Sequence, residues 1–248
     1  MKAVILGAGT GSRLGARTDD RPKVMVEVGG ESLLERLARQ LRALGVDELV
    51  VATGHREDAV RRALPRLPMK TTLCFNADYA RTQNVVSLHA CADAILAGGA
   101  VPTWKLDGDL WLDDRLLARM AAAPLPDDAL LCAVDLRDDL GEEEMKVRIE
   151  GDAIRAFGKH LDPKTAQGES MGIELLGPVA VSSVLHMVSR AVTAGDTRLY
   201  YEDVYDRGIS RGLHAIPVSL GDLPWTEIDT PEDLARAEAL AGTRVAPA

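Results

Sequence analysis

Glycines and cations near the start of the chain have the types and spacing of a phosphate-binding site. An apolar run over residues 2–6 leads into Gly-Ala-Gly-Thr-Gly-Ser-Arg at 7–13, and Pro22-Lys23 follows. Glycines allow backbone N–H groups to line a concave anion site. Arg13 adds a planar guanidinium that suits phosphate oxygens, and Lys23 adds a mobile point charge. We therefore predict that this segment holds the phosphates of a nucleotide.

Two other classes of glycine loop do not fit these residues. A dinucleotide-binding loop needs Gly-x-Gly-x-x-Gly, but the sixth residue is Ser12 when counted from Gly7 and Leu14 when counted from Gly9. A P-loop needs a lysine directly after its glycines, and none stands there. An NAD-binding protein is therefore disfavoured. A plain strand-to-helix turn with two solvated cations is the simpler alternative.

Two acidic clusters fall at the ends of predicted strands. They are Asp107-Gly108-Asp109 and Glu227-Ile228-Asp229. Mg²⁺ takes oxygen ligands and often only one or two carboxylates, and ligands of open α/β sheets bind at the carboxyl ends of the strands. Both clusters are candidates for a metal ion that neutralises a nucleotide's phosphates. Taken singly, each is also explained as a loop or a helix cap.

The elements around these motifs alternate between strands and helices. Strands are expected at 2–6, 47–55, 71–75, 100–112 and 213–220, and helices at 32–44, 57–64, 84–96, 179–194 and 230–241. This alternation predicts a Rossmann-like α/β fold, with a mostly parallel mixed sheet flanked by helices. Extended stretches within 130–176 predict a small antiparallel, lid-like insertion. We expect a single domain over residues 1–248, with a frayed tail at 243–248.

Composition and charge limit the partners of the chain. Its net charge is −9, so counterion release gives it no affinity for DNA or RNA, and no nucleic-acid partner is expected. Its three cysteines show no metal-binding or redox spacing. No apolar run approaches the roughly 20 residues of a membrane span, and the first residues predict a strand and not a signal peptide. We expect a cytoplasmic protein without a membrane partner, and a homodimer remains an open alternative.

On these motifs the chain resembles the sugar-phosphate nucleotidyltransferase family. That family's signature, L-[AG]-A-G-x-G-x-R followed by P-K, stands here at residues 6–13 and 22–23. Its G-D motif corresponds to Asp109, and its late W-x-E-I-D motif ends at Asp229. The resemblance implies that six loop residues approach the nucleotide, namely Leu6, Gly7, Ala8, Gly9, Thr10 and Gly11.

The same resemblance implies roles for the charged residues. Arg13 would hold the β- and γ-phosphates, and Lys23 would reach the α-phosphate and the incoming acceptor. Asp109 and Asp229 would chelate Mg²⁺. Two further acids are expected beside them, as ligands of a second ion or as supports of the metal and the nucleotide, namely Asp107 and Glu227.

Phosphocholine and 2-aminoethylphosphonate cytidylyltransferases are the branch that the chain is most similar to. The similarity is collinear and covers nearly the whole chain, in the segments 76–88, 143–161, 168–176, 200–205 and 224–237. It implies CTP as the nucleotide, with Asn84 and Ser87 near the pyrimidine. Helix capping is the alternative role of these two side chains.

The acceptor site is the least defined part of this prediction. Lys146 is expected as a catalytic cation over the acceptor's phosphate or phosphonate, and solvent-exposed lysines are the alternative. The candidates for contact with the rest of the acceptor are Lys159, Glu169, Tyr201, Glu202 and Asp203. Tyr200 and the three tryptophans are candidates for cation–π contact with an amine, although core packing is the simpler role for each.

Together these features predict a Mg²⁺-dependent cytidylyltransferase. It would transfer CMP from CTP to phosphocholine, 2-aminoethylphosphonate or a hydroxyalkylphosphonate, and release pyrophosphate. A nucleotidyltransferase for a sugar 1-phosphate or a cyclitol phosphate is the alternative. A non-catalytic nucleotide-binding regulatory subunit is an alternative from another class.

Overall fold

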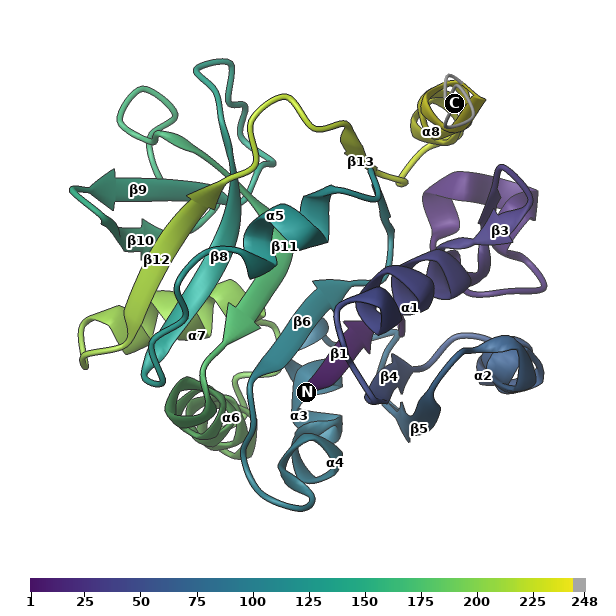
Figure 1. The fold of residues 1–248 in the computed structure, drawn as a ribbon, viewed down its shortest axis with the longest axis horizontal. Coiled ribbons are helices and arrows are strands. Elements are labelled where there is room, and N and C mark those ends of the chain that lie inside the picture. The colour runs from purple at the N-terminus through teal and green to yellow at the C-terminus, as the bar shows by residue number, and fades with distance from the viewer. Residues whose placement is uncertain (243–248) are drawn as a thin grey trace.

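Four parallel strands form one half of a central sheet in the computed structural model, which describes residues 1–242 (Figure 1). They run in the spatial order β6 (Thr103–Asp107), β1 (Lys2–Leu6), β4 (Glu48–Thr53) and β5 (Lys70–Phe75). Leu6 of β1 is in register with Ala52 on one side and with Asp107 on the other. The residues that follow β1, β4 and β6 therefore meet at one edge of the sheet.

Antiparallel strands extend the sheet beyond β6. β11 (Gly168–Leu176) pairs with β6 and with β8 (Ala129–Leu136), and β12 (His214–Ser219) runs parallel to β8. The hairpin of β9 (Lys146–Glu150) and β10 (Ala153–Phe157) joins through β9 to the start of β11. The segment expected to be antiparallel thus contributes strands to the main sheet. That this segment forms a lid-like insertion remains a prediction.

Two small antiparallel sheets lie outside the main one. β2 (Glu27–Val28) pairs with β3 (Glu31–Ser32), and β7 (Leu110–Leu112) pairs with β13 (Trp225–Glu227). Short 3₁₀ turns follow the glycine loop and α2, at Ser12–Thr18, Lys23–Met25 and Leu64–Arg66. The β7–β13 pair brings the late acidic cluster close to the end of β6.

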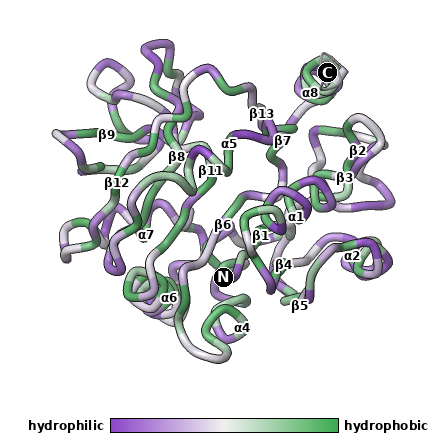
Figure 2. Tube along the Cα trace, viewed as in Figure 1, coloured by the Kyte–Doolittle hydropathy of each residue, from purple (hydrophilic) through white to green (hydrophobic). Residues whose placement is uncertain are grey.

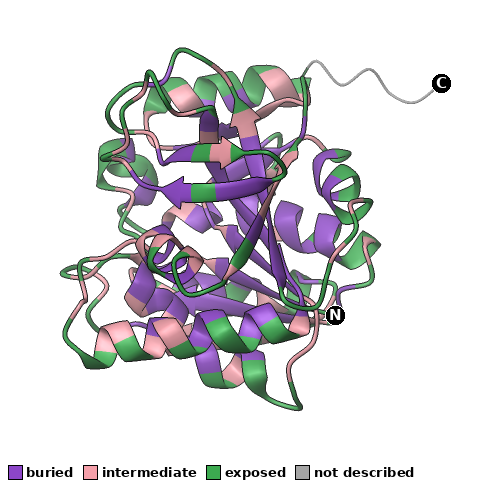
Figure 3. Cartoon of the chain, turned by 90° about the vertical axis from the view of Figure 1, so that its left-hand side faces the viewer, coloured by how far each residue is buried: buried purple, intermediate pink, exposed green. Residues whose placement is uncertain are grey.

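Helices cover both faces of the sheet and bury opposite sides of each strand. One face carries α1 (Leu33–Ala43), α2 (Glu57–Ala63) and α5 (Leu116–Ala121). The other carries α3 (Asn84–Ala90), α4 (Ala92–Leu96), α6 (Pro178–Thr193) and α7 (Tyr201–Ile209). Along β1, Ala3 and Ile5 enter the first core and Val4 the second, because side chains alternate along a strand. The strands are mostly buried and the helices half-buried (Figure 3).

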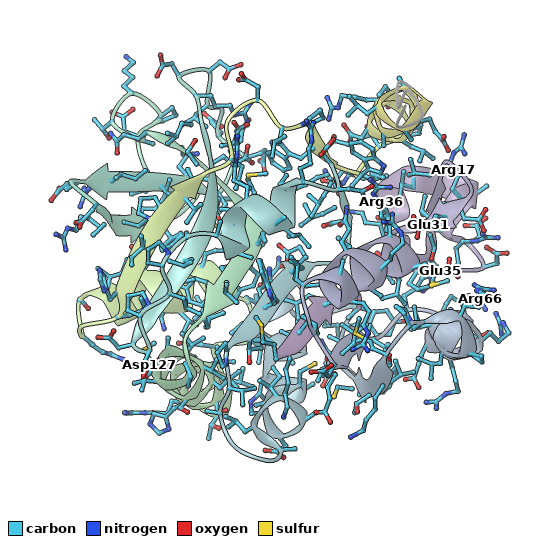
Figure 4. The ribbon with its side chains drawn as sticks, viewed as in Figure 1. Arg17, Glu31, Glu35, Arg36, Arg66 and Asp127 are labelled. Carbon is cyan, nitrogen blue, oxygen red and sulfur yellow. The ribbon has the colours of Figure 1, made fainter. Side chains whose placement is uncertain are left out.

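Helix ends in the structure follow the local rules that the sequence indicates. Glu35 N–H donates to Ser32 Oγ at 3.3 Å, and Ser32 N–H donates to Glu35 at 3.2 Å, which is a capping box at the start of α1. Glu35 also accepts from Arg66 at 2.5 Å, and Arg66 ends the 3₁₀ turn that follows α2 (Figure 4). α8 (Pro231–Gly242) begins with the predicted proline, and its N-cap is the hydroxyl of Thr230.

Asp127 supports the start of α6. It lies beside that helix in Figure 4, and its carbonyl accepts from the N–H groups of Val179 and Ala180 at 2.9 and 3.1 Å. These bonds satisfy two of the N–H groups that a helix start leaves without an intrahelical partner.

Hydrophobic residues lie along the central strands, and hydrophilic residues lie in most outer loops (Figure 2).

The predicted fold class is confirmed, and two predicted elements are corrected. The strand expected over 100–112 is two strands, β6 and β7, separated by Gly108 and Asp109. The helix expected over 84–96 is two helices, α3 and α4, which meet at Cys91. The predicted frayed tail lies outside the described residues. Among the described helices, none is long and apolar enough to cross a bilayer.

Candidate active site

The glycine loop is anchored to the neighbouring strand where β1 ends. Gly7 N–H donates to the carbonyl of Ala52 at 3.0 Å, and His55 N–H donates to the carbonyl of Ala8 at 3.2 Å. A Cβ at Gly7 would lie 3.0 Å from a methyl of Val24, so the loop passes closer than most side chains allow. These contacts hold the loop at the carboxyl edge of the parallel strands.

Beyond this anchor the loop turns its backbone outward. Gly9 and Thr10 are exposed, and Gly11 has φ +64°, in the left-handed region that favours glycine. Among the described residues, no hydrogen bond engages the N–H groups of Gly9, Thr10 or Gly11. Free N–H groups in a turn of this kind suit the oxygens of a phosphate.

Lys23 joins the two carboxylates that were predicted as metal ligands. Its Nζ donates to Asp109 Oδ2 at 2.8 Å and also to Asp229 Oδ1. Arg13 donates to the other oxygen of Asp229 at 2.7 Å. Burial opposes the charged form of Lys23, but Asp109 and Asp229 outweigh it and raise its pKa above the ordinary value. The structure thus brings four predicted residues together and keeps the lysine charged.

Asp109 and Asp229 fit a metal ion of the magnesium type. Asp109 Oδ1 is buried and has no hydrogen-bond partner among the described residues. A buried carboxylate oxygen without a partner is costly unless something else binds it. Mg²⁺ commonly uses one or two carboxylates and takes its other oxygens from phosphates and water. In the part of the chain that the structure describes, no group of three or more His, Cys, Asp and Glu is placed to hold a metal.

Gly108 explains how Asp109 reaches this position. Its N–H donates to the carbonyl of Leu6 at 3.0 Å, and a Cβ there would lie 2.7 Å from the same oxygen. Only glycine lets the chain turn so closely against β1. The carbonyl of Asp109 then accepts from the N–H of Ile228 at 2.9 Å, which ties the early acidic cluster to the late one.

Asp107 belongs to a buried ionic cluster beneath the site. Its oxygens lie 3.0 Å from Lys105 Nζ and accept from the Tyr201 hydroxyl at 2.8 Å. Lys105 also lies 3.1 Å from Glu174, and Glu202 is buried nearby. Burial raises the pKa of Glu174 to about 8 and that of Glu202 to about 7. Tyr201 and Glu202, predicted as acceptor residues, therefore lie under the site and not on its surface.

A cleft of about 580 Å³ opens beside Asp229. Lys159 and Glu169, both predicted for the acceptor, line it together with Glu227. Its lining consists mainly of charged residues, namely Arg13, Asp135, Arg137, Glu143, Glu144, Lys159, Glu169, Glu227, Asp229, Asp233 and Arg236, with Trp225 and Thr226. The size suits a small molecule beside a nucleotide.

Arg137 is a residue of this cleft that the sequence interpretation missed. It donates to Glu169 at 2.7 Å and to Glu144 at 3.4 Å. Burial raises the pKa of Glu169, and the Arg137 guanidinium opposes that rise. The available signal in the sequence was a cation directly after the strand that ends at Leu136. Such a cation does not by itself indicate a ligand-binding residue.

Lys146 lies elsewhere than its predicted catalytic role requires. Its side chain is buried, and its ammonium donates to the carbonyls of Gly141, Glu142 and Glu144 at 2.8, 3.2 and 3.2 Å. The reason is local, because the acidic run before β9 folds back and surrounds the ammonium with backbone oxygens. Lys146 therefore holds this loop in place, and it is not among the residues that line the cleft.

Three more predicted side chains hold elements in place. Asn84 accepts from the N–H of Tyr201 at 2.9 Å, so it joins α3 to the start of α7. Ser87 is buried and accepts from Asn76 at 3.1 Å. Asp203 accepts from the N–H of Tyr200 at 2.8 Å, at the start of α7. For Asn84, the capping alternative matches the geometry, although the helix that it caps is α7.

This mixed sheet with helices on both faces is the architecture of nucleotide-diphospho-sugar transferases. The inositol-1-phosphate CTP transferase of T. maritima superposes with a TM-score of 0.79 and 22% identity, over 99% of this chain and 98% of that one. The CTP:phosphocholine cytidylyltransferase of Streptococcus pneumoniae superposes with a TM-score of 0.77 and 20% identity, over 96% and 98%. The chain belongs to the family of MobA-like NTP transferase domains, which it matches over residues 3–143.

Curated relatives match nearly the whole chain. The CMP-5'-(3-aminopropyl)phosphonate synthase of Streptomyces rubellomurinus is 29% identical over 96% of this chain and 38% of its own length. The bifunctional IPC transferase and DIPP synthase of Rubrobacter xylanophilus is 28% identical over 96% of this chain and 51% of its own length. The chain thus spans about half or less of these two relatives.

Proposed function

We propose that this chain is a Mg²⁺-dependent cytidylyltransferase that transfers CMP from CTP to a small phosphate or phosphonate and releases pyrophosphate. The observation that carries the proposal is the joining of Lys23, Asp109 and Asp229 beside the exposed glycine loop. The names of similar proteins support the choice of nucleotide and acceptor, since they include synthases and transferases of CMP-phosphonate, phosphocholine and inositol phosphate.

The reaction needs one bond to form and one to break. An ionised oxygen of the acceptor attacks the α-phosphorus of CTP, and the bond from that phosphorus to the oxygen bridging the β-phosphate breaks in line with it. Because the attacking oxygen is already ionised, no strong general base is required. Catalysis is then positioning and charge stabilisation.

Each residue of the site has a role in this scheme. The N–H groups of Gly9, Thr10 and Gly11 receive phosphate oxygens, and Arg13 steadies the leaving pyrophosphate. Lys23, once phosphate oxygens are near, stabilises charge that develops at the α-phosphorus. Asp109 and Asp229 would hold Mg²⁺, which supplies electrostatic neutralisation of the triphosphate.

Pyrophosphate release tests the proposal. The purified chain is incubated with Mg²⁺ and CTP, UTP, GTP or ATP, each paired with phosphocholine, 2-aminoethylphosphonate, a hydroxyalkylphosphonate, inositol 1-phosphate or glucose 1-phosphate. We expect release with CTP and one small phosphate or phosphonate. Release only with another nucleotide and a sugar phosphate would contradict the specificity. Tight CTP binding without release for any acceptor would contradict the enzymatic proposal and favour a regulatory subunit.

A further inference from the structure

We infer that a groove between α6 and α7 is a second ligand site, which binds a small organic phosphate through a cluster of arginines. The groove has a volume of about 400 Å³. The residues that line it are Ser183, His186, Met187, Arg190, Ala191, Val204, Arg207 and Arg211. None of these residues lines the cleft beside Asp229. A ligand in the groove is therefore distinct from the substrates of the proposed transfer.

The groove arises from the way α6 packs against α7. α6 buries one stripe of its surface in the hydrophobic core, namely Val181, Val184, Leu185 and Val188. A different face of the same helix, also at helical spacing, lines the groove through Ser183, His186, Met187, Arg190 and Ala191. On α7, Gly208 leaves room for this packing, because a Cβ there would lie 2.8 Å from the Cε of Met187. The two helices therefore lie side by side along the groove (Figure 1).

Arginines give the groove a positive charge. Arg190, Arg207 and Arg211 are all exposed, and among the described residues no carboxylate lines the groove. Arg207 donates to Asp196 at 2.7 Å, outside the lining. The chain as a whole carries a net charge of −9. A positive groove on such a molecule is a local feature that attracts anions against the overall field.

Two of these guanidinium groups have no partner within the described chain. Most arginines donate to an acid or to a backbone carbonyl, as Arg81 does to Asp78 at 2.6 Å. In the part of the chain that the structure describes, the arginines without a side-chain hydrogen bond or ion pair are Arg17, Arg190, Arg198 and Arg211. Arg190 and Arg211 lie in this one groove, so their N–H donors are available to a ligand there.

The lining suits a phosphate that is bonded to an apolar group. A guanidinium presents its N–H groups in a planar fork that matches two phosphate oxygens, and the hydroxyl of Ser183 adds a donor. Met187, Ala191 and Val204 form the apolar part of the lining. The volume and this mixture of apolar and polar groups are typical of a small-molecule site. An anionic lipid surface is disfavoured, because it would repel a chain with a net charge of −9.

The methyl resonance of Met187 reports binding in the groove. Protein labelled with ¹³C at the methionine methyl groups is titrated at constant ionic strength with phenyl phosphate, inorganic phosphate or phenylacetate. Inorganic phosphate lacks the apolar group, and phenylacetate replaces the phosphate with the carboxylate of an acidic peptide. We expect phenyl phosphate to shift this resonance and to bind at least about tenfold more tightly than either.

Two results of this titration would overturn the inference. One is an unchanged Met187 resonance at all concentrations of phenyl phosphate. The other is equal or tighter binding of phenylacetate, which would make the groove a site for an acidic peptide.

Arg190→Gln and Arg211→Gln identify the residues responsible. Each should weaken the binding of phenyl phosphate, measured at Met187, by at least about tenfold, because a charged hydrogen bond is lost. Arg198→Gln is the matched control, since Arg198 is also exposed and without a side-chain partner among the described residues but lies outside the groove. It should keep the affinity of the parent chain. Equal weakening in all three variants would show that only the overall charge attracts the phosphate, and the inference would fail.

Lys23→Met separates the groove from the active site. The variant should leave the titration at Met187 unchanged, because Lys23 lies at the glycine loop and not in the groove. Loss of the Met187 shift in this variant would mean that phenyl phosphate acts through the active site, and the inference would be wrong. No step of this test uses CTP or pyrophosphate release, so its failure would leave the proposed function as it stands.

Discussion

Lys23 is the residue on which three distant segments converge. It follows the glycine loop, while Asp109 follows β6 and Asp229 follows β13. Two carboxylates so close together repel each other, and the ammonium between them offsets that repulsion. The same ammonium competes with any metal for those oxygens. A triphosphate would offer it new anionic partners, so metal binding and nucleotide binding are expected to support each other.

Lys23→Met should separate these two effects. Removal of the competing ammonium should tighten binding of Mn²⁺ without nucleotide by about tenfold, the equivalent of one pKa unit of interaction. The same variant should chiefly lower kcat, because a group that acts in the transition state is lost. Mn²⁺ titration followed by paramagnetic resonance measures the first effect, and steady-state kinetics the second.

Lys70→Met is the control for the loss of one positive charge, since Lys70 pairs with Glu48 on the surface. It should leave Mn²⁺ binding and kcat as in the parent chain. A pure rise in KM for Lys23→Met would mean that Lys23 binds ground state and transition state alike.

Asp109→Ala and Asp229→Ala should each lower turnover by at least about 100-fold, as loss of a key electrostatic stabiliser does. Pyrophosphate release at saturating Mg²⁺ is the measurement. Near-normal turnover of either variant would remove that residue from the active site.

At the scale of elements, turns and helix starts hold these residues in position. In the β6–β7 turn, the N–H of Gly108 donates to the carbonyl of Leu6, and the carbonyl of Asp109 accepts from the N–H of Ile228, which follows β13. On the other side of the sheet, Asn84 fixes the start of α7, and Tyr201 of that helix binds Asp107. The acidic clusters are thus held by backbone hydrogen bonds between distant segments and by the contact of Tyr201 with Asp107.

Gly108→Ala tests the close turn. The added Cβ would lie 2.7 Å from the Leu6 carbonyl, so the backbone must move and Asp109 must move with it. We expect a loss of about 1–3 kcal/mol in the free energy of unfolding, together with a marked fall in kcat. Denaturant unfolding and pyrophosphate release measure the two.

Gly242→Ala is the matched control, because a Cβ there meets none of the described residues within 4 Å and the residue ends α8. It should leave stability and turnover close to those of the parent chain. If the two variants had equal stability and equal turnover, the prediction that position 108 requires glycine would be wrong.

At the scale of the whole molecule, charge is divided between a buried cluster and an open cleft. Lys105 is the one cation within ion-pair distance of Asp107 and Glu174, between β6 and β11, among the described residues, and Glu202 adds a third buried carboxyl. One lysine does not neutralise three carboxylates, so a proton is retained there near neutral pH. This cluster supports Asp107 directly below the site.

Stability should therefore fall as pH rises through this cluster. The folded chain binds a proton on Glu174 up to a pKa of about 8, whereas the unfolded chain releases it near its ordinary value of 4.5. Between those values the folded state holds more protons, so unfolding becomes easier with rising pH. Glu174→Gln should flatten this fall between about pH 6 and 8.5, measured by urea unfolding. An unchanged slope would place the retained proton on another group.

Local patterns predicted most of the elements and the residues at the strand ends. Alternation of strands and helices, the glycine loop and the cap at Thr230 are all short-range signals, and the confirmed fold class follows from them. The candidates Arg13, Lys23, Asp109 and Asp229 also come from short motifs. The residue types in each motif are set by the chemistry of phosphate and metal binding, and this holds wherever the motif lies in the chain.

Long-range packing decided the rest. Only the folded chain shows that Lys146 is surrounded by carbonyls, that Tyr201 and Glu202 are buried, and that Arg137 enters the cleft. It also leaves Glu227 without a positive partner among the described residues. Sequence by itself determined which side chains are able to bind phosphate and metal, because that depends on residue type. Tertiary structure decided which of them meet, because a side chain's partners and burial depend on strands that are distant in the chain.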